Sequence, residues 1–173
     1  MDSQQFKATQ APLKDQYRRE PSAAKVTLTA RGAVGDGAIS CKVETGRALR
    51  DAGLHPATGG DGSFACSGDM LLEALVACAG VTLKAVATSM GVNLRGGTVI
   101  AEGDLDFRGT LGISREAKVG FEAVRVRFEL DTDAPADAVE RLIKLTERYC
   151  VVYQTLYSPP RLEMSHTTAG GAV

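Results

Sequence analysis

Residues 67–91 read SGDMLLEALVACAGVTLKAVATSMG, and this stretch predicts the element around which the fold is built. Its apolar residues recur at intervals of three and four, which places them on one face of a helix: Leu72, Val76, Ala79, Leu83, Val86 and Met90. Apolar residues occupy the other faces too, and in 70–87 only Glu73 and Lys84 are charged. A helix that is apolar nearly all round is normally buried. The stretch therefore predicts a long buried central helix with Cys78 at its middle.

The sequence also marks the ends of this helix. Ser67 is predicted as the N-cap, and Gly91 as the residue that ends the helix in a left-handed conformation. Asp69 lies in the first turn, where a negative charge favours the helix dipole. The stretch is as long as a membrane span, but Glu73 and Lys84 would each cost about a few kcal/mol in hydrocarbon, which favours burial in protein.

The rest of the chain predicts strands and further helices. Apolar and polar residues alternate in the strand regions, and the glycines of 32–37 predict a turn that makes a hairpin of the first two strands. The predicted elements are, in chain order, an amphipathic helix (3–19), the two hairpin strands (25–30 and 39–44), a glycine-rich loop (45–66), the central helix, two long strands (97–108 and 121–130), a helix (133–150), a short helical turn from 151 and a last strand (161–166).

This order of elements predicts the fold class. Strands that arrive in antiparallel groups, without regular alternation with helices, are typical of an α+β fold. We expect antiparallel sheets around the long central helix, in one domain over residues 21–173 that follows an N-terminal helical arm over 1–20. One protomer has too little other structure to cover the central helix, and the simplest way to bury it is against the same helix of a second subunit. The sequence thus predicts an obligate homodimer.

Charge and composition exclude several classes of partner. Twenty basic and 21 acidic residues give a net charge of −1, so we expect neither nucleic acid nor a membrane surface as a partner. The first twenty residues lack the apolar stretch of a secretory signal, which predicts a cytoplasmic protein. His55 and His166 are isolated and the four cysteines form no CxxC pair, so we expect no metal site and no cofactor.

The cysteines are the candidate reactive residues. Cys41 lies on the apolar side of its predicted strand and is expected to be structural. Cys66 is either a third redox thiol or a loop residue, and we favour the loop residue. Cys78 and Cys150 are 72 residues apart, so they can meet only if two helices pack together. From these residues alone, a pair of buried core cysteines and a redox pair both remain open.

Two motifs resemble a known family. Residues 68–78 read GDMLLEALVAC, and residues 148–156 read RYCVVYQTL. They resemble the two cysteine motifs of the OsmC/Ohr family of thiol peroxidases, and the order of elements is similar over about residues 22–166. The resemblance, to the OsmC-like branch, implies an intertwined homodimer with its active sites at the subunit interface. It implies that Cys78 is the peroxidatic thiolate, that Cys150 is the resolving thiol, that the substrate is an organic hydroperoxide, and that a lipoyl-type dithiol is the reductant.

One position departs from the family pattern. The Ohr branch carries its catalytic arginine in the turn of the first hairpin, where this chain has Gly35, and the nearest basic residues are Arg31 and Arg47. The acid that orients the arginine in that branch corresponds best to Asp69, so a catalytic acid and a first-turn helix charge both stay open for this residue. Cys78 lies far from the N-terminus of its own helix, so the helix dipole does not stabilise its thiolate. One positive charge about 4 Å from the sulfur could instead stabilise the thiolate by roughly 4 kcal/mol. A non-catalytic OsmC-like dimeric binding protein without the activating arginine is therefore the alternative hypothesis.

Overall fold

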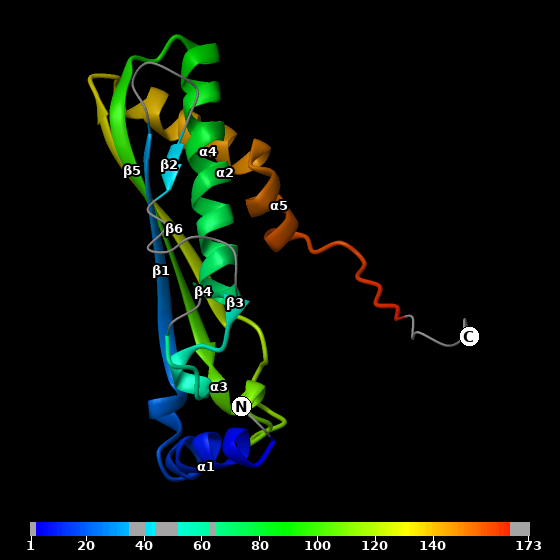
Figure 1. The fold of residues 1–173 in the computed structure, drawn as a ribbon. Helices are drawn as coiled ribbons and strands as arrows, with labels where there is room; N and C mark the ends of the chain where they lie inside the picture. Colours follow the sequence, from blue (N-terminus) through cyan, green and yellow to red (C-terminus); the bar gives the residue numbers. More distant parts are fainter. Residues whose placement is uncertain (1–2, 35–40, 44–51, 63–64, 167–173) are drawn as a thin grey trace.

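The computed structural model describes residues 3–34, 41–43, 52–62 and 65–166 of the chain (Figure 1). Its helices are α1 (Ser3–Arg19), α2 (Ser67–Met90), α3 (Phe107–Thr110), α4 (Ala136–Tyr149) and α5 (Val151–Tyr157), with short 3-10 turns η1 (Pro21–Ala24) and η2 (Pro56–Thr58). Its strands are β1 (Lys25–Val34), β2 (Cys41–Val43), β3 (Ala52–Gly53), β4 (Ala65–Cys66), β5 (Leu94–Asp106) and β6 (Ala123–Thr132). Helix α2 lies along a long sheet, and α1 lies beyond one end of that sheet near α3.

Four strands form one antiparallel sheet in the order β2-β1-β5-β6. Strand β1 pairs with β5 along its whole length, from Lys25 opposite Asp106 to Val34 opposite Gly97. We expected more than one antiparallel sheet, and this was wrong in detail. Strand β1 continues past its predicted end and therefore joins the hairpin to the long strands, while the other sheet is only the short parallel pair β3-β4. The α+β class with an antiparallel sheet is confirmed.

Helix α2 covers the sheet and also contacts α4 and α5. Its buried residues follow the predicted stripe: Leu72, Leu75, Val76, Ala79, Gly80, Leu83, Lys84 and Ala87. The ammonium of Lys84 donates a hydrogen bond of 2.9 Å to the Leu94 carbonyl oxygen, which satisfies a charge inside the apolar interface. The apolar spacing of the sequence therefore predicted the core face of this helix.

The opposite side of α2 is not buried within one protomer. Leu71 and Val81 have 38% and 40% of their surface exposed, so the prediction of a fully buried helix holds for only one face of the isolated chain. Among the described residues, α2 is also the one helix that is long and apolar enough to cross a membrane by length and composition, a test that the core helix of a soluble protein passes equally.

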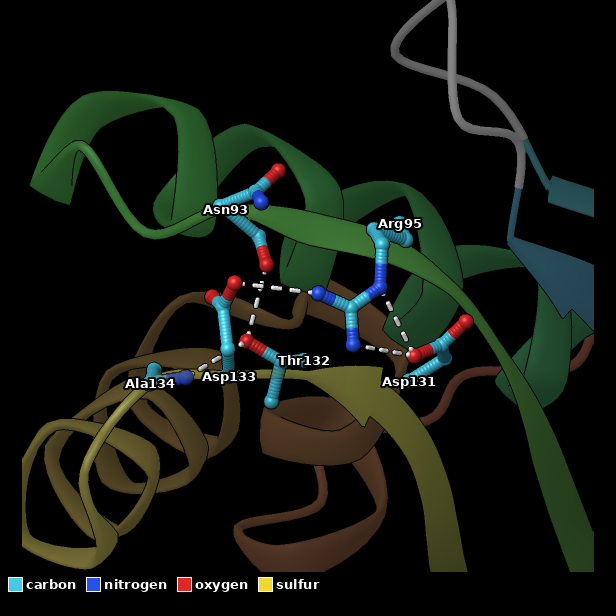
Figure 2. A network of polar contacts seen from close by, with 6 residues as sticks. All are labelled: Asn93, Arg95, Asp131, Thr132, Asp133 and Ala134. Atoms are coloured by element: carbon cyan, nitrogen blue, oxygen red, sulfur yellow. Dashed lines mark hydrogen bonds and ion pairs between the residues drawn. The ribbon is translucent and has the colours of Figure 1, made fainter.

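A polar network fixes the junction between β6 and α4 (Figure 2). The guanidinium of Arg95, on β5, donates hydrogen bonds of 2.7 and 2.9 Å to Asp131 and one of 3.1 Å to Asp133. The backbone amide of Ala134 donates a hydrogen bond of 3.2 Å to the hydroxyl oxygen of Thr132. Because α4 begins just after this junction, the network helps to set the direction in which α4 leaves the sheet.

Helix α1 forms as predicted and is held by polar contacts to η2. The hydroxyl of Tyr17 donates a hydrogen bond of 2.7 Å to the Ala57 carbonyl oxygen, and the side-chain amide of Gln10 donates one of 3.1 Å to the Thr58 carbonyl oxygen. Tyr17 has only 3% of its surface exposed and belongs to the hydrophobic core. The division into an arm over 1–20 and a domain over 21–173 stays a prediction.

The ends of several elements differ from the sequence predictions. Ser67 is the first residue of α2, and Cys66 stands at the N-cap position without a side-chain cap. Pro135, rather than Asp133, occupies the N-cap position of α4. Residues 161–166 form no strand, because this exposed segment extends away from the sheet and meets no strand with which to pair (Figure 1). Gly91 ends α2 in the left-handed conformation, as predicted.

Candidate redox site

Two cysteines that are distant in the chain meet where α2 packs against α4 and α5. Cys78 lies at the middle of α2 and is partly exposed, whereas Cys150 lies between α4 and α5 and has 1% of its surface exposed. Both are free thiols, and the thiol of Cys150 donates a hydrogen bond to the sulfur of Cys78. The structure thus brings together the two sulfur atoms that the family resemblance pairs.

The chain changes direction at Cys150, and this places backbone amides at the site. Cys150 has an extended conformation that ends α4, and its carbonyl oxygen accepts a hydrogen bond of 2.9 Å from the Gln154 amide, which begins α5. The first amides of a helix have no acceptor within that helix. The amides of Val151 and Val152 use this free capacity to donate hydrogen bonds to the sulfur of Cys78.

Hydrogen bonds determine the net shift in the pKa of Cys78. Burial raises the pKa of this thiol, as it does for any group that becomes charged on deprotonation. The hydrogen bonds from the Val152 amide, the Cys150 thiol, the Thr82 hydroxyl and the Val151 amide favour the thiolate, and together they lower the pKa of Cys78 below its ordinary value. Cys78 is therefore the sulfur of the pair that ionises first.

Cys150 has the opposite character. The pKa of Cys150 is raised to about 11, mainly by burial. A hydrogen bond from the Tyr153 amide lowers this pKa in part, whereas the hydrogen bond to Cys78 and the charge of Cys78 raise it. A thiol with this pKa stays protonated near neutral pH and can act as a donor to the neighbouring thiolate. The pair thus consists of a thiol whose pKa is lowered by hydrogen bonds and a buried thiol whose pKa is raised.

The expected cation does not account for the lowered pKa of Cys78. The leading influences on this pKa, among the residues that the structure describes, are burial and hydrogen bonds rather than a charged arginine or lysine. Arg31 lies on β1 and its side chain is exposed. Gly35 and Arg47, the other positions considered for the arginine, lie outside the described residues.

Asp69 lies away from the thiol pair in the protomer. It is nine residues before Cys78 on the same helix, which corresponds to about 13 Å along the axis. Burial raises the pKa of Asp69, and the nearby charge of His55 lowers it. Burial lowers the pKa of His55, and Asp69 raises it. The structure therefore places Asp69 beside His55, and a catalytic role for Asp69 stays a prediction.

Cys66 and the two histidines lie outside the thiol pair. Cys66 ends β4, where it pairs with Gly53, so it belongs to a short strand rather than to the loop we expected. His55 accepts a hydrogen bond of 3.0 Å from the Ala57 amide and stacks on Phe107. In the described part of the chain, no group of three His, Cys, Asp or Glu side chains is arranged to hold a metal ion.

Two cavities lie near the α5 side of α2, and one of them reaches the thiol pair at Cys150. An apolar groove of about 480 Å³ lies among α2, β6 and α5, and its lining includes Leu71, Leu75, Phe121, Tyr153 and Tyr157. A smaller cavity of about 190 Å³ reaches Cys150, and its lining includes Ala79, Val126, Phe128, Thr146, Glu147 and Tyr153. We call the smaller one the Cys150 cavity. Tyr153 lines both spaces, so it lies at their boundary.

Comparison with known protein families assigns residues 60–165, more than half of the chain, to the OsmC-like proteins. The chain belongs to the OsmC-like family. The fold of this OsmC-like protein is similar to the solved structure of an OsmC-like hydroperoxide resistance protein from Jannaschia sp. CCS1, with a TM-score of 0.60 and 16% sequence identity. The similarity covers 86% of this chain and 97% of that one. No curated protein matches the sequence significantly.

Membership of the OsmC-like family confirms the recognition made from the two cysteine motifs, which lie within the matched residues. The sequence did not predict the two amides of α5. The sequence did carry a signal for these donors, because it predicted a helical turn immediately after Cys150. Only the packing of that turn against α2 makes its amides donors to Cys78.

Proposed function

We propose that this OsmC-like protein is a thiol-dependent peroxidase that reduces organic hydroperoxides, with Cys78 as the attacking thiolate and Cys150 as the resolving thiol. The observation that carries the proposal is the hydrogen-bonded sulfur of Cys78, whose pKa is lowered beside a thiol whose pKa is raised. The solved relative is described as a hydroperoxide resistance protein, which supports the same substrate class.

The proposed reaction uses the two thiols in order. The Cys78 thiolate attacks the terminal oxygen of the hydroperoxide, the O–O bond breaks, and the alkoxide leaves and takes a proton to become an alcohol. Cys78 is then a sulfenic acid. The Cys150 thiol loses its proton and attacks the Cys78 sulfur, the S–O bond breaks, and water leaves. The protein gains one disulfide, and the hydroperoxide gains two electrons.

The environment of each thiol suits its proposed role. A free cysteine is only about 3% thiolate at pH 7, so a lowered pKa increases the reactive population of Cys78. Cys78 is partly exposed, while Cys150 stays protonated near neutral pH because its pKa is raised to about 11, so it does not compete for the peroxide. The apolar groove, which shares Tyr153 with the cavity that Cys150 lines, could receive the alkyl part of an organic hydroperoxide.

The resemblance extends the proposal to partners and location. We propose that the protein works as a cytoplasmic homodimer that a lipoyl-type dithiol returns to the reduced state, and that Asp69 takes part in the assembled site. The apolar side chains on the outer face of α2 support the dimer, because a second subunit could cover them.

One experiment tests the peroxidase. Reduced protein is treated with one equivalent of an alkyl hydroperoxide, and the disulfides are mapped by mass spectrometry. We expect a Cys78–Cys150 disulfide in the wild type and in Cys66→Ser, the matched cysteine control. Cys150→Ser should stop at the sulfenic acid of Cys78. A Cys78 that stays reduced in the wild type would contradict the proposal.

A second function is favoured by one observation. Among the described residues, no arginine or lysine is one of the leading influences on the pKa of Cys78. The second function is that of a non-catalytic OsmC-like dimeric binding protein that lacks the activating arginine and uses the apolar groove for a ligand. A measured Cys78 pKa above about 8, close to that of a free thiol, together with slow reaction with peroxide, would favour this function over the peroxidase.

A further inference from the structure

The two sulfur atoms of the candidate site face different surroundings. Cys78 is partly exposed on α2. Cys150 has almost no exposed surface, yet it lines the Cys150 cavity between β6 and α4, whose lining includes Ala79 but not Cys78. A molecule that enters this cavity therefore meets Cys150, whereas Cys78 is not part of the lining.

We propose that a small dithiol reductant enters the Cys150 cavity and attacks the sulfur of Cys150, and that Tyr153 and Glu147 control its entry. The proposal rests on the proposed function, because it describes how the Cys78–Cys150 disulfide is reduced.

The different environments of the two sulfurs favour attack at Cys150. In thiol–disulfide exchange the sulfur that is not attacked leaves as a thiolate, and a thiol of lower pKa leaves faster. The α5 amides and the Thr82 hydroxyl already donate hydrogen bonds to Cys78 and lower its pKa. Attack at Cys78 would instead expel Cys150, whose pKa is raised. Cys78 is thus the better leaving group.

The proposed reduction proceeds in two thiol–disulfide exchange steps. A thiolate of the reductant forms a bond to the Cys150 sulfur, the Cys78–Cys150 bond breaks, and Cys78 leaves with the electron pair. The second thiol of the reductant loses a proton and attacks the reductant sulfur that is bound to Cys150. Cys150 leaves and is protonated, and the reductant becomes a cyclic disulfide that has given up two electrons.

Tyr153 and Glu147 are the polar side chains beside Cys150 that the proposal assigns to control of entry, and both line the Cys150 cavity. Tyr153 lines both the Cys150 cavity and the apolar groove, and its ring stacks with that of Tyr157 at 6.3 Å between centroids. Burial raises the pKa of Tyr153, and the charge of Glu147 and a hydrogen bond to its carboxylate raise it further. The phenol and the carboxylate are therefore in contact within the lining of the cavity.

The site of attack can be mapped directly. The Cys78–Cys150 disulfide is formed with diamide, so the test does not need activity toward peroxides. The oxidised protein is mixed with dihydrolipoamide or with the monothiol cysteamine, quenched in acid at early times, and labelled with a maleimide. Mass spectrometry then identifies which cysteine carries the mixed disulfide.

We expect the mixed disulfide mainly on Cys150, with the maleimide on Cys78. A mixed disulfide mainly on Cys78 would overturn the proposal. Failure of diamide to link Cys78 with Cys150 would overturn it too, since the substrate of the proposed step could not form. A positive result in a protein that does not reduce hydroperoxides would support this inference and contradict the proposed function.

Variants of Tyr153 test control of entry. Tyr153→Trp should slow reduction of the diamide-formed disulfide by dihydrolipoamide severalfold, and Tyr153→Ala should speed it severalfold. The matched control is Tyr149→Trp, an exposed aromatic at the end of α4 outside the cavity lining, which should react like the wild type. A purely structural role of Tyr153 would change both Tyr153 variants in the same direction, and that result would contradict the gating role.

Discussion

At the scale of single residues, the reactive character of Cys78 depends on donors that the neighbouring elements supply. Its position in the middle of α2 excludes help from the N-terminus of that helix. The hydrogen bonds of the Val151 and Val152 amides, the Cys150 thiol and the Thr82 hydroxyl offset the effect of burial on its pKa. A cation is therefore not required to explain a lowered pKa, although an arginine could lower it further.

Replacing Thr82 with valine tests one of these donors. Thr82→Val keeps the shape of the side chain but removes the hydroxyl, so the thiolate should lose about 1 kcal/mol of stabilisation and the pKa of Cys78 should rise. The thiolate exists above that pKa and disappears as the pH falls through it, so the variant should need a higher pH to react. The pH dependence of alkylation of Cys78 measures this shift.

The matched control is Thr88→Val, which removes a hydroxyl that donates a hydrogen bond of 2.8 Å to the Lys84 carbonyl oxygen of the same helix. It should leave the pH profile of Cys78 unchanged. Equal shifts in the two variants would show that Thr82 acts through the stability of α2 and not through the sulfur.

At the scale of elements, the break between α4 and α5 places the site. Cys150 ends one helix and begins the next, so the buried thiol and the two amide donors come from consecutive residues. The network around Arg95 holds the start of α4, and α4 carries Cys150 at its other end (Figure 2). One continuous helix through Cys150 would have used these amides in its own hydrogen bonds.

Val151→Pro tests the contribution of the first α5 amide. Proline is well tolerated at the first position of a helix, and the extended conformation of Cys150 suits a residue before proline. The Val151 side chain is mostly exposed, so little packing is lost.

The Val151→Pro variant should keep the fold and raise the pKa of Cys78. The thermal midpoint of unfolding checks the fold, and the pH dependence of alkylation measures the pKa. Val151→Ala, which retains the amide, should behave like the wild type, and an unchanged pKa in Val151→Pro would be evidence against this donor.

Tyr17→Phe tests how α1 is attached to the rest of the chain. The variant leaves the Ala57 carbonyl oxygen without the Tyr17 hydroxyl, and we expect unfolding to require about 1 kcal/mol less free energy in urea titrations. The pKa of Cys78 should not change, because α1 does not contribute to that site. Wild-type stability in this variant would mean that water replaces the lost hydrogen bond.

At the scale of the whole molecule, the outer face of α2 is the main feature that one protomer leaves unexplained. The inner face packs on the sheet, whereas Leu71 and Val81 on the outer face remain substantially exposed. Exposed apolar side chains along one face of a long helix favour a second subunit as their cover. The proposed homodimer would bury the face and leave the Cys78–Cys150 contact within each chain.

Val81→Asp tests this arrangement. The side chain is exposed in the protomer, so the charge should be tolerated there, but at a subunit interface it would be left without solvent and should dissociate the dimer. Sedimentation velocity should find monomers for Val81→Asp and dimers for the control Val119→Asp, which changes an exposed valine in a connecting segment. Dimers for both variants would place the interface elsewhere.

The sequence alone determined the core face of α2, the α+β class, the family, and which two cysteines lie in the family's motifs, Cys78 and Cys150. These features depend on local periodicity and on motifs that are read along the chain. The sequence did not determine that the strands join in one four-stranded sheet, that residues 161–166 stay unpaired, or that Asp69 lies beside His55. Those features depend on which distant segments pack together. The same is true of Cys78, because the amides that lower its pKa lie more than 70 residues away, and only tertiary packing of α5 on α2 brings them to its sulfur.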